Sequence, residues 1–226
     1  MHIIYRNLFT KLRIDNFQTQ ERLEPMSRFK IRKLMAIMKH IADMPAGEIA
    51  LSNPILNRRL KKIQREEPHA IDTSIETIYL LRIIVSNVNA TMNYGMPVRG
   101  IIQLGQYLRS RGDKVDFVKL EHWLAKLHIA RLAQLQGSIL ISLLGFSKEE
   151  LPFVKRIERN AVPLTLRSIN NIERDEAQHA GQDNGLPSHN TRKLLCRNIS
   201  YLTYAPMETI GNLLSNFSKS LPKIEE

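Results

Sequence analysis

The chain has few cysteine and aromatic residues, and the shortage of each excludes a class of protein. Cys196 is the only cysteine among 226 residues, so the chain can form neither an internal disulfide nor a zinc site built from cysteines. Phenylalanine, tryptophan and tyrosine together make up 6% of the chain, and leucine, isoleucine and methionine therefore carry most of its apolar mass. This composition suits the packing of helices better than a β-sandwich or a β-barrel, and the single cysteine favours a reducing cytoplasm.

Long apolar runs are also lacking. No window offers the roughly 18 consecutive apolar residues that a membrane-spanning helix needs. The chain begins with a short apolar stretch that Arg6 and Lys11 interrupt, and it has no small-residue cleavage site of the kind that ends a secretory signal. We therefore expect a cytoplasmic protein without a membrane partner.

The sequence contains no residue set that indicates catalysis or the binding of a metal or a cofactor. None of the seven histidines forms a His-x-x-x-His pair, which is a common spacing of metal ligands. Cys196 lies in an apolar stripe and is expected to fill space in the core rather than to act as a nucleophile. We therefore assign no catalytic residue, no cofactor and no metal ligand.

The sequence does have a surplus of positive charge, and most of it lies in the first half. The net charge is +11 at pH 7. Residues 1–114 hold 19 lysines and arginines against 10 acidic residues, whereas residues 115–226 hold 14 against 12. A basic half favours nucleic acid or an anionic membrane surface as a partner. An ordinary solvated helical surface can carry the same charge, so composition alone does not decide between these interpretations.

Apolar residues recur at intervals of three and four along most of the chain, and alternation with a period of two is almost absent. We therefore predict an all-α fold, an irregular bundle of about eight helices without internal repeats. Residues 1–25 are expected to form an N-terminal arm or a short leading helix. Residues 26–226 are expected to form one helical domain, of which 26–114 is the basic part and 115–226 is nearly neutral.

The most hydrophobic segment, 73–93, is predicted to be a central helix. Thr73 and Glu76 have the spacing of a capping box at its start. Its apolar residues cover more than one face, which is typical of a helix buried on all sides. Trp123, in a later helix that Asp116 is expected to cap, should pack into the same core.

The remaining helices are predicted from the same spacing. Residues 147–172 are expected to be helical with interruptions at Pro152 and Pro163, and residues 180–190 are expected to form a loop. A helix after Ser27 has the apolar stripe Phe29, Ile31, Leu34, Met35, Met38 and Ile41. A later helix runs through Leu194, Leu195, Ile199 and Leu202. The last helix begins at Pro206 and carries the apolar residues Met207, Ile210, Leu213, Leu214 and Phe217.

One predicted helix has the character of a binding element. The residues Ser52-Asn53-Pro54 open it, with proline in the first turn. Four basic residues along it are separated by three or four positions and therefore share one face, which could neutralise several phosphates. No aromatic residue is interleaved for base stacking, and the alternative is a solvated face with Glu66 and Glu67 as partners. Its apolar stripe is Leu56, Leu60 and Ile63, and its basic residues are Arg58, Lys61, Lys62 and Arg65.

Four motifs from the middle of the chain suggest a family. They are Arg99-x-Ile-x-Gln-Leu-x-x-Tyr-Leu, Leu120-x-x-Trp-Leu-x-x-Leu, Arg131-x-Ala-Gln-x-x-Gly-x-x-Leu and Leu144-Gly-Phe-x-Lys-Glu-Glu-x-Pro-Phe. In this order they resemble the helical C-terminal part of a bacterial family of uncharacterised nucleotidyltransferases. The resemblance covers residues 50–226 of this chain.

The activity for which that family is named would need a Gly-Ser pair on a turn and an Asp-x-Asp on a strand, which together hold magnesium and a triphosphate. This chain has no Asp-x-Asp, and its only Gly-Ser pair, Gly137-Ser138, lies inside an apolar run. The resemblance therefore implies a fold region without a catalytic residue, similar to the accessory part of such a protein.

Two functions of different classes remain open. The first is a protein-interaction or regulatory module that completes a separate catalytic protein. The alternative is a nucleic-acid-binding protein that contacts phosphates through the basic helix at 54–67. Salt distinguishes them, because phosphate contacts weaken steeply as salt rises whereas an apolar interface does not. The sequence does not indicate an oligomeric state.

Overall fold

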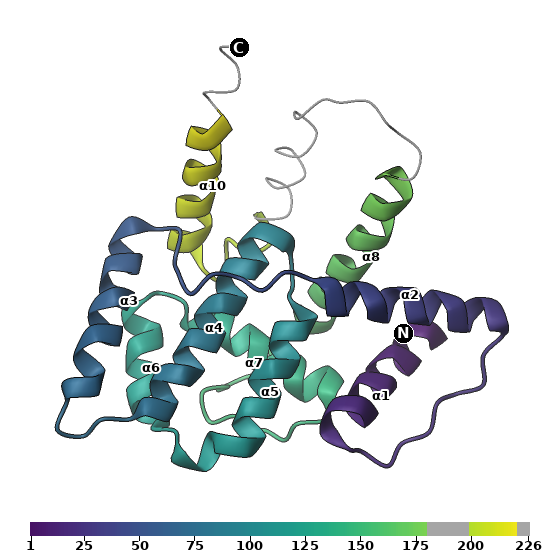
Figure 1. Ribbon diagram of the computed structural model, residues 1–226, viewed down its shortest axis with the longest axis horizontal. Helices are drawn as coiled ribbons and strands as arrows, with labels where there is room; N and C mark the ends of the chain where they lie inside the picture. The colour runs from purple at the N-terminus through teal and green to yellow at the C-terminus, as the bar shows by residue number, and fades with distance from the viewer. Residues whose placement is uncertain (180–198, 221–226) are drawn as a thin grey trace.

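The computed structural model describes residues 1–179 and 199–220, and these form nine α-helices and two short 3₁₀ helices without a strand (Figure 1). The prediction of an all-α fold is confirmed. The predicted loop at 180–190, the residues Leu194 and Leu195, and Cys196 lie outside the described residues. The α-helices are α1 (Ile3–Phe17), α2 (Arg28–Asp43), α3 (Pro54–Glu66), α4 (Ile75–Tyr94), α5 (Val98–Arg111), α6 (Phe117–Lys126), α7 (Ala130–Leu144), α8 (Ala161–His179) and α10 (Pro206–Ser220). The 3₁₀ helices are η1 (Glu67–His69) and η2 (Gly112–Lys114).

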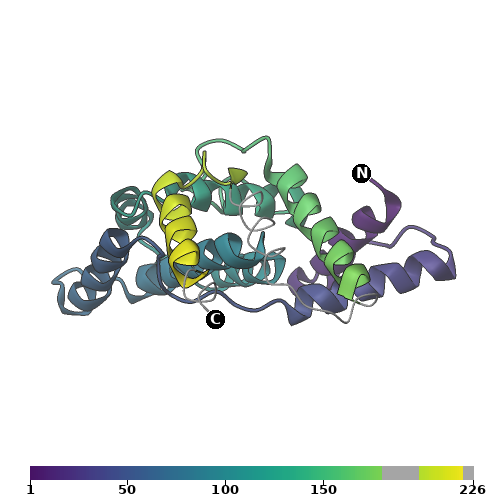
Figure 2. The same ribbon diagram turned by 90° about the horizontal axis from the view of Figure 1, so that it is seen from above.

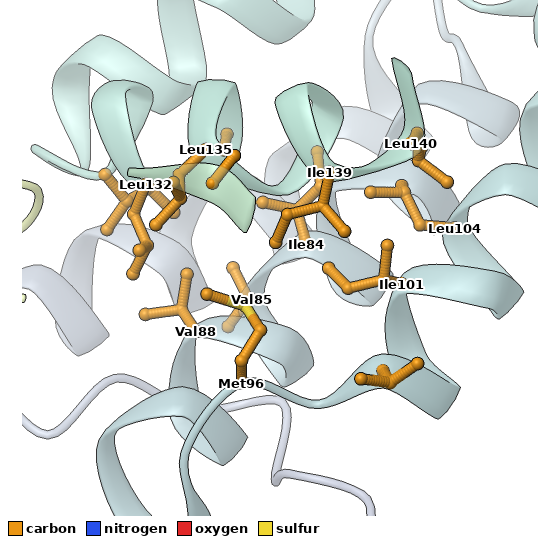
Figure 3. Close-up of a cluster of buried hydrophobic side chains, with 14 of the residues drawn as sticks. Ile84, Val85, Val88, Met96, Ile101, Leu104, Leu132, Leu135, Ile139 and Leu140 are labelled. Carbon is orange, nitrogen blue, oxygen red and sulfur yellow. The ribbon is translucent and has the colours of Figure 1, made fainter. Parts of the chain in front are cut away.

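The centre of the molecule is α4, as the segment 73–93 predicts. Because this helix is apolar nearly all round, it is stable only when other helices cover several of its sides, and it contacts α5, α6 and α7. Trp123 of α6 is 7% exposed and belongs to the same core, which confirms its predicted burial. The side chains that meet at the centre come from α4 (Ile84, Val85, Val88), from α5 (Ile101, Leu104) and from α7 (Leu132, Leu135, Ile139, Leu140) (Figure 3).

The first helix, α1, packs into the same core. Leu8, Phe9 and Leu12 are buried, and the helix contacts α2, α5 and α7. A hydrogen bond reinforces this packing, since Nη1 of Arg13 donates to the carbonyl oxygen of Leu143 at 2.8 Å. The end of α7 is therefore tied directly to the beginning of the chain.

Residues 44–53 form a non-helical strap that connects α2 with α3 across α4 (Figure 1). The hydroxyl of Ser86 donates to the carbonyl oxygen of Gly47 at 2.6 Å, and the amide of Asn89 donates to the carbonyl oxygen of Ala50 at 3.3 Å. The two backbones approach so closely at Gly47 that a Cβ there would lie 2.0 Å from the carbonyl oxygen of Ser86. Only glycine fits this contact.

Several predicted helix boundaries are confirmed. The side chain of Asn53 accepts hydrogen bonds from the first backbone N–H groups of α3, and Pro54 occupies the first turn. The carboxylate of Asp116 accepts from the backbone N–H three residues later at 2.9 Å and so caps α6. The predicted break near His128 separates α6 from α7, and Gly145 ends α7 with a φ of 74°.

The predicted capping box of α4 is wrong. The helix begins at Ile75, and Ser74 at its N-cap makes no side-chain capping hydrogen bond. The backbone N–H of Ser74 instead donates to the carboxylate of Glu67 at 2.8 Å. A buried carboxylate from η1 thus satisfies a donor next to the start of α4, and the pair Thr73 and Glu76 does not form the predicted reciprocal cap.

The prediction that residues 147–172 are helical is confirmed for 161–172 and is wrong for 147–160. Residues 145–160 contain no helix, and α8 begins only at Ala161. Pro163 lies in the first turn of α8, where the N–H that proline lacks would have had no partner within the helix. A proline that was expected to interrupt a helix therefore lies at its start.

Only part of the predicted apolar stripe of α2 is buried. Leu34 and Ile41 face the core together with Ile37, which lies outside that stripe. The helix is at one end of the molecule and packs against α1 and α5 with one side only (Figure 1). Met38 is half-buried against the core, and three further members are exposed, namely Phe29 at 74%, Ile31 at 44% and Met35 at 54%.

We expect Gly47→Ala to destabilise the protein. The added Cβ would force the strap away from α4, and such overpacking costs about 1–3 kcal/mol of unfolding free energy. Urea unfolding followed by circular dichroism measures the loss. Gly112→Ala is the matched control, since a Cβ there meets nothing within 4 Å, and its midpoint should stay the same or rise slightly. Equal midpoints for the two variants would show that the strap is not held against α4.

Candidate interaction surfaces

The four basic residues predicted as a nucleic-acid contact lie together on the solvent side of α3. All four are exposed, while the apolar stripe on the other side of the helix is 0–5% exposed. The helix is thus anchored by its apolar side and presents its charge to solvent. We call this set the basic row: Arg58, Lys61, Lys62 and Arg65.

The basic row is hardly neutralised by carboxylates. Lys62 lies 3.8 Å from Glu66, and both side chains are more than half exposed, so the pair stabilises little. Glu67, the other carboxylate expected to pair with the row, is turned inward and lies 3.0 Å from the Nζ of Lys119. No other carboxylate in residues 1–179 and 199–220 forms an ion pair with the row. Of the two carboxylates that the solvated-face interpretation places beside the row, only Glu66 is there.

The charge of the basic half does not gather on a single surface. The two helices richest in basic residues, α2 and α3, lie at opposite ends of the longest axis, which both views show (Figures 1 and 2). The basic row and the cations of α2 are therefore two separate patches. The candidate nucleic-acid contact remains the basic row of α3.

The last helix, α10, packs with its polar side inward. Glu208 and Thr209 are fully buried and Asn212 is 3% exposed. The predicted apolar residues mostly point the other way, and we call the exposed ones the apolar stripe. Its members are Met207 at 41%, Ile210 at 49%, Leu214 at 64% and Phe217 at 61% exposed.

Hydrogen bonds hold the polar side of α10 in place. The carboxylate of Glu208 accepts from the backbone N–H groups of Ser52 and Asn53, the latter at 3.1 Å. The amide of Asn212 donates to the side-chain oxygen of Asn93 at 2.9 Å. A Cβ on Gly211 would lie 2.9 Å from backbone atoms of Asn53, so the helix touches the loop before α3 directly. Because these partners fix which side of α10 faces inward, Met207, Ile210 and Leu214 stay largely exposed to solvent.

The apolar stripe has the features of a helix-pairing surface. Its members are spaced by three, four and three residues, which is the spacing of a seam between two helices. Among the side chains of α10 that the structure describes, Glu208 is the only charged one, and it is buried. Sequence reasoning identified the apolar residues but not their exposure, since the spacing does not tell which side of a helix finds a partner.

The Gly-Ser pair that the nucleotidyltransferase resemblance would require on a turn has a structural role in α7. A Cβ on Gly137 would lie 2.3 Å from Val154, so the glycine allows the segment after α7 to pack closely. The hydroxyl of Ser138 donates to the carbonyl oxygen of Gln134 at 2.7 Å and accepts from the backbone N–H of Glu158 at 3.0 Å. Neither residue is available to bind a triphosphate.

The described part of the chain contains no group of three His, Cys, Asp or Glu side chains placed to hold a metal ion. None of its helices combines the length and the apolar character that crossing a membrane requires. Comparisons with protein-family models, with curated proteins and with solved structures give no match.

A pH dependence follows from the buried carboxylate. Burial raises the pKa of Glu208 above its usual value, although the N–H groups of Ser52 and Asn53 oppose this rise. A raised pKa means that the folded state holds the proton more tightly than the unfolded chain does. The stabilising contribution is therefore complete below the unfolded pKa of about 4.3 and is lost as the pH rises through the folded pKa.

We therefore expect the wild type to lose unfolding free energy relative to the Glu208→Gln variant as the pH rises from 4 to 7. Glutamine has nearly the same shape but does not titrate, so the difference isolates this carboxyl. Urea unfolding at each pH measures it. A difference that stays constant or grows in favour of the wild type would contradict the buried position of Glu208.

Proposed function

We propose that the protein is a non-catalytic helical module that binds another protein through the apolar stripe of α10. The observation that carries this proposal is the orientation of α10. The helix buries Glu208 and Thr209, and it leaves Met207, Ile210 and Leu214 exposed to solvent. A row of neighbouring exposed apolar residues is uncommon on a monomeric protein and is typical of an interaction site.

A partner that covered the apolar stripe would gain binding free energy from the burial of its side chains. Burying a leucine, isoleucine, methionine or phenylalanine side chain contributes about 1.5–3 kcal/mol when the side chain starts fully exposed. Met207, Ile210 and Leu214 are 41–64% exposed, so a partner that covered these three side chains would gain roughly 2–5 kcal/mol. This supports a reversible interface rather than a permanent one, since association itself costs several kcal/mol.

The partner that fits this surface is an amphipathic helix of another protein. The alternating spacing of three and four residues matches a helix laid along α10, and the absence of described exposed charge on α10 favours an apolar face opposite it. The resemblance to the helical part of nucleotidyltransferase-like proteins suggests the class of partner. It would be a separate catalytic protein that this chain completes or regulates.

We expect Leu214→Asp to abolish capture of this partner while leaving the fold intact. Leu214 is 64% exposed in the protein, but its replacement would place an unpaired carboxylate inside the interface, which should weaken binding by tenfold or more. The bait is pure protein in a nuclease-treated lysate of the native cell, and the captured protein is then purified and titrated against the variants.

Val118→Asp is the matched control for this experiment, because Val118 is 84% exposed on α6 and lies outside the apolar stripe. The proposal requires a partner that the wild type and Val118→Asp bind equally and that Leu214→Asp does not. Equal binding by all three proteins, or no partner under these conditions, would overturn it.

A second function, nucleic-acid binding, is favoured by a different observation. The basic row is exposed and largely without carboxylate partners among the described residues, so its cations remain available to phosphates. Contacts of this kind carry no base information, and binding should therefore be independent of sequence. The two proposed functions use different helices and can be tested separately.

If nucleic acid is bound, we expect replacement of the whole basic row by alanine to flatten the salt dependence of binding. Each phosphate contact contributes about 0.9 to the slope of log K against log salt, so the slope should fall by roughly three to four units. Fluorescence anisotropy with labelled duplex and single strand measures it.

The control for the basic row removes the same number of charges from α2 by replacing Arg28, Lys30, Arg32 and Lys39 with alanine. Because α2 lies at the other end of the molecule, that variant should keep most of the parental slope. Equal flattening in both variants would indicate unspecific attraction, and an unchanged slope in the α3 variant would identify the row as a solvated surface.

A further inference from the structure

A cleft of about 740 Å³ opens between α6, the first turn of α7 and the segment that ends at Arg156. Its size is that of a site for a small molecule. Leu124 and Phe153 are among its apolar lining residues, and Arg131, Gln134 and Arg156 are among its polar ones. The cleft shares no lining residue with the basic row or the apolar stripe, so its binding can be tested separately from the proposed functions.

Arg131 is held in a fixed orientation at this cleft. Its Nε and Nη2 lie 3.3 and 3.4 Å from the two carboxylate oxygens of Glu158, and its Nη1 donates to the carbonyl oxygen of Thr203 at 3.0 Å. The guanidinium also stacks on the ring of Tyr204, with its Cζ 4.9 Å from the centroid. Three of the five N–H groups are used in this way, and two remain for a ligand. An arginine that is already ordered loses little entropy when it binds.

The charges around the cleft leave a positive surplus. Arg131 and Arg156 share the single carboxylate of Glu158, with the Nε of Arg156 at 3.5 Å from it. Lys155 is neutralised by Glu121 at 2.7 Å. Burial raises the pKa of Glu158, but hydrogen bonds from Arg131 and Gln134 outweigh this and lower it. The carboxylate therefore stays ionised, and the group formed by two arginines and one glutamate carries one net positive charge.

The N-terminus of α7 adds hydrogen-bond donors at the same place. Ile129 at the N-cap offers no side-chain acceptor, and within the described residues the backbone N–H groups of Ala130, Arg131 and Leu132 have no acceptor. Ala130 and Arg131 line the cleft. The positive end of the helix dipole, equivalent to about half a charge, thus points toward the same space as the two guanidinium groups.

We propose that this cleft binds a small phosphate-bearing molecule, with the phosphate between Arg131, Arg156 and the first turn of α7. Two guanidinium groups and a helix N-terminus offer more donors than the two oxygens of a carboxylate can accept, whereas a tetrahedral phosphate has three free oxygens. Its charge of between one and two also matches the surplus of the cleft. The apolar part of the molecule lies toward Leu124 and Phe153.

The test is calorimetric titration of the pure protein with inorganic phosphate, pyrophosphate and acetate at low salt and pH 8. We expect saturable binding of phosphate or pyrophosphate and weaker binding of acetate. Arg156→Gln should weaken phosphate binding about tenfold, because one charge-assisted hydrogen bond is lost. Arg159→Gln is the matched control, since Arg159 is exposed three residues further along but does not line the cleft, and its affinity should stay within about twofold of the wild type.

A second variant, Arg131→Lys, keeps the charge but loses the forked geometry, and it should also weaken phosphate binding while circular dichroism shows an intact fold. No saturable binding of phosphate or pyrophosphate, equal weakening by Arg156→Gln and Arg159→Gln, or acetate binding as tight as phosphate binding would each overturn the proposal. None of these outcomes bears on the apolar stripe, whose test uses a protein partner.

Discussion

The burial of α4 is the constraint on which the rest of the structure depends. A helix that is apolar nearly all round must be covered on several sides. Its sides are covered by α5, α6, α7 and the strap at 44–53. The buried amide side chains of α4 then determine which neighbour lies where. Asn87 bonds to Gly100 and Gln136, and Asn89 bonds to the strap, and a buried amide without its partner would cost roughly 1–3 kcal/mol. Burial of apolar surface drives the helices together, and the buried amides determine which neighbour packs on which side of α4.

Sequence reasoning recovered those features that depend on nearby residues. Asn53, Asp116 and Gly145 end or begin helices through contacts within a few positions, so their roles were predictable. The exposure of the basic row was predictable as well, because the apolar residues of α3 already occupy the opposite side. The membership of the chain in a nucleotidyltransferase-like family remains a prediction.

The features that sequence reasoning missed depend on residues far apart in the chain. Glu208 finds its partners at Ser52 and Asn53, more than 150 residues earlier, and this contact decides which side of α10 is buried. Amphipathic spacing shows that a helix has two sides, but not whether the neighbour offers apolar side chains or backbone N–H groups. The same holds for the cleft, whose central carboxylate, Glu158, lies in a segment that was expected to be helical.

The hydrogen bond from Arg131 to the carbonyl oxygen of Thr203 gives the cleft a mechanical connection to α10. Thr203 lies only three residues before Pro206, the first residue of α10. The guanidinium of Arg131 is therefore bonded to the backbone close to the start of that helix. The guanidinium keeps two N–H groups for a ligand while a third stays on Thr203, so a phosphate in the cleft and the start of α10 would share one side chain. Thermodynamic linkage makes such an influence reciprocal, so occupancy of the cleft and occupancy of α10 would each report on the other.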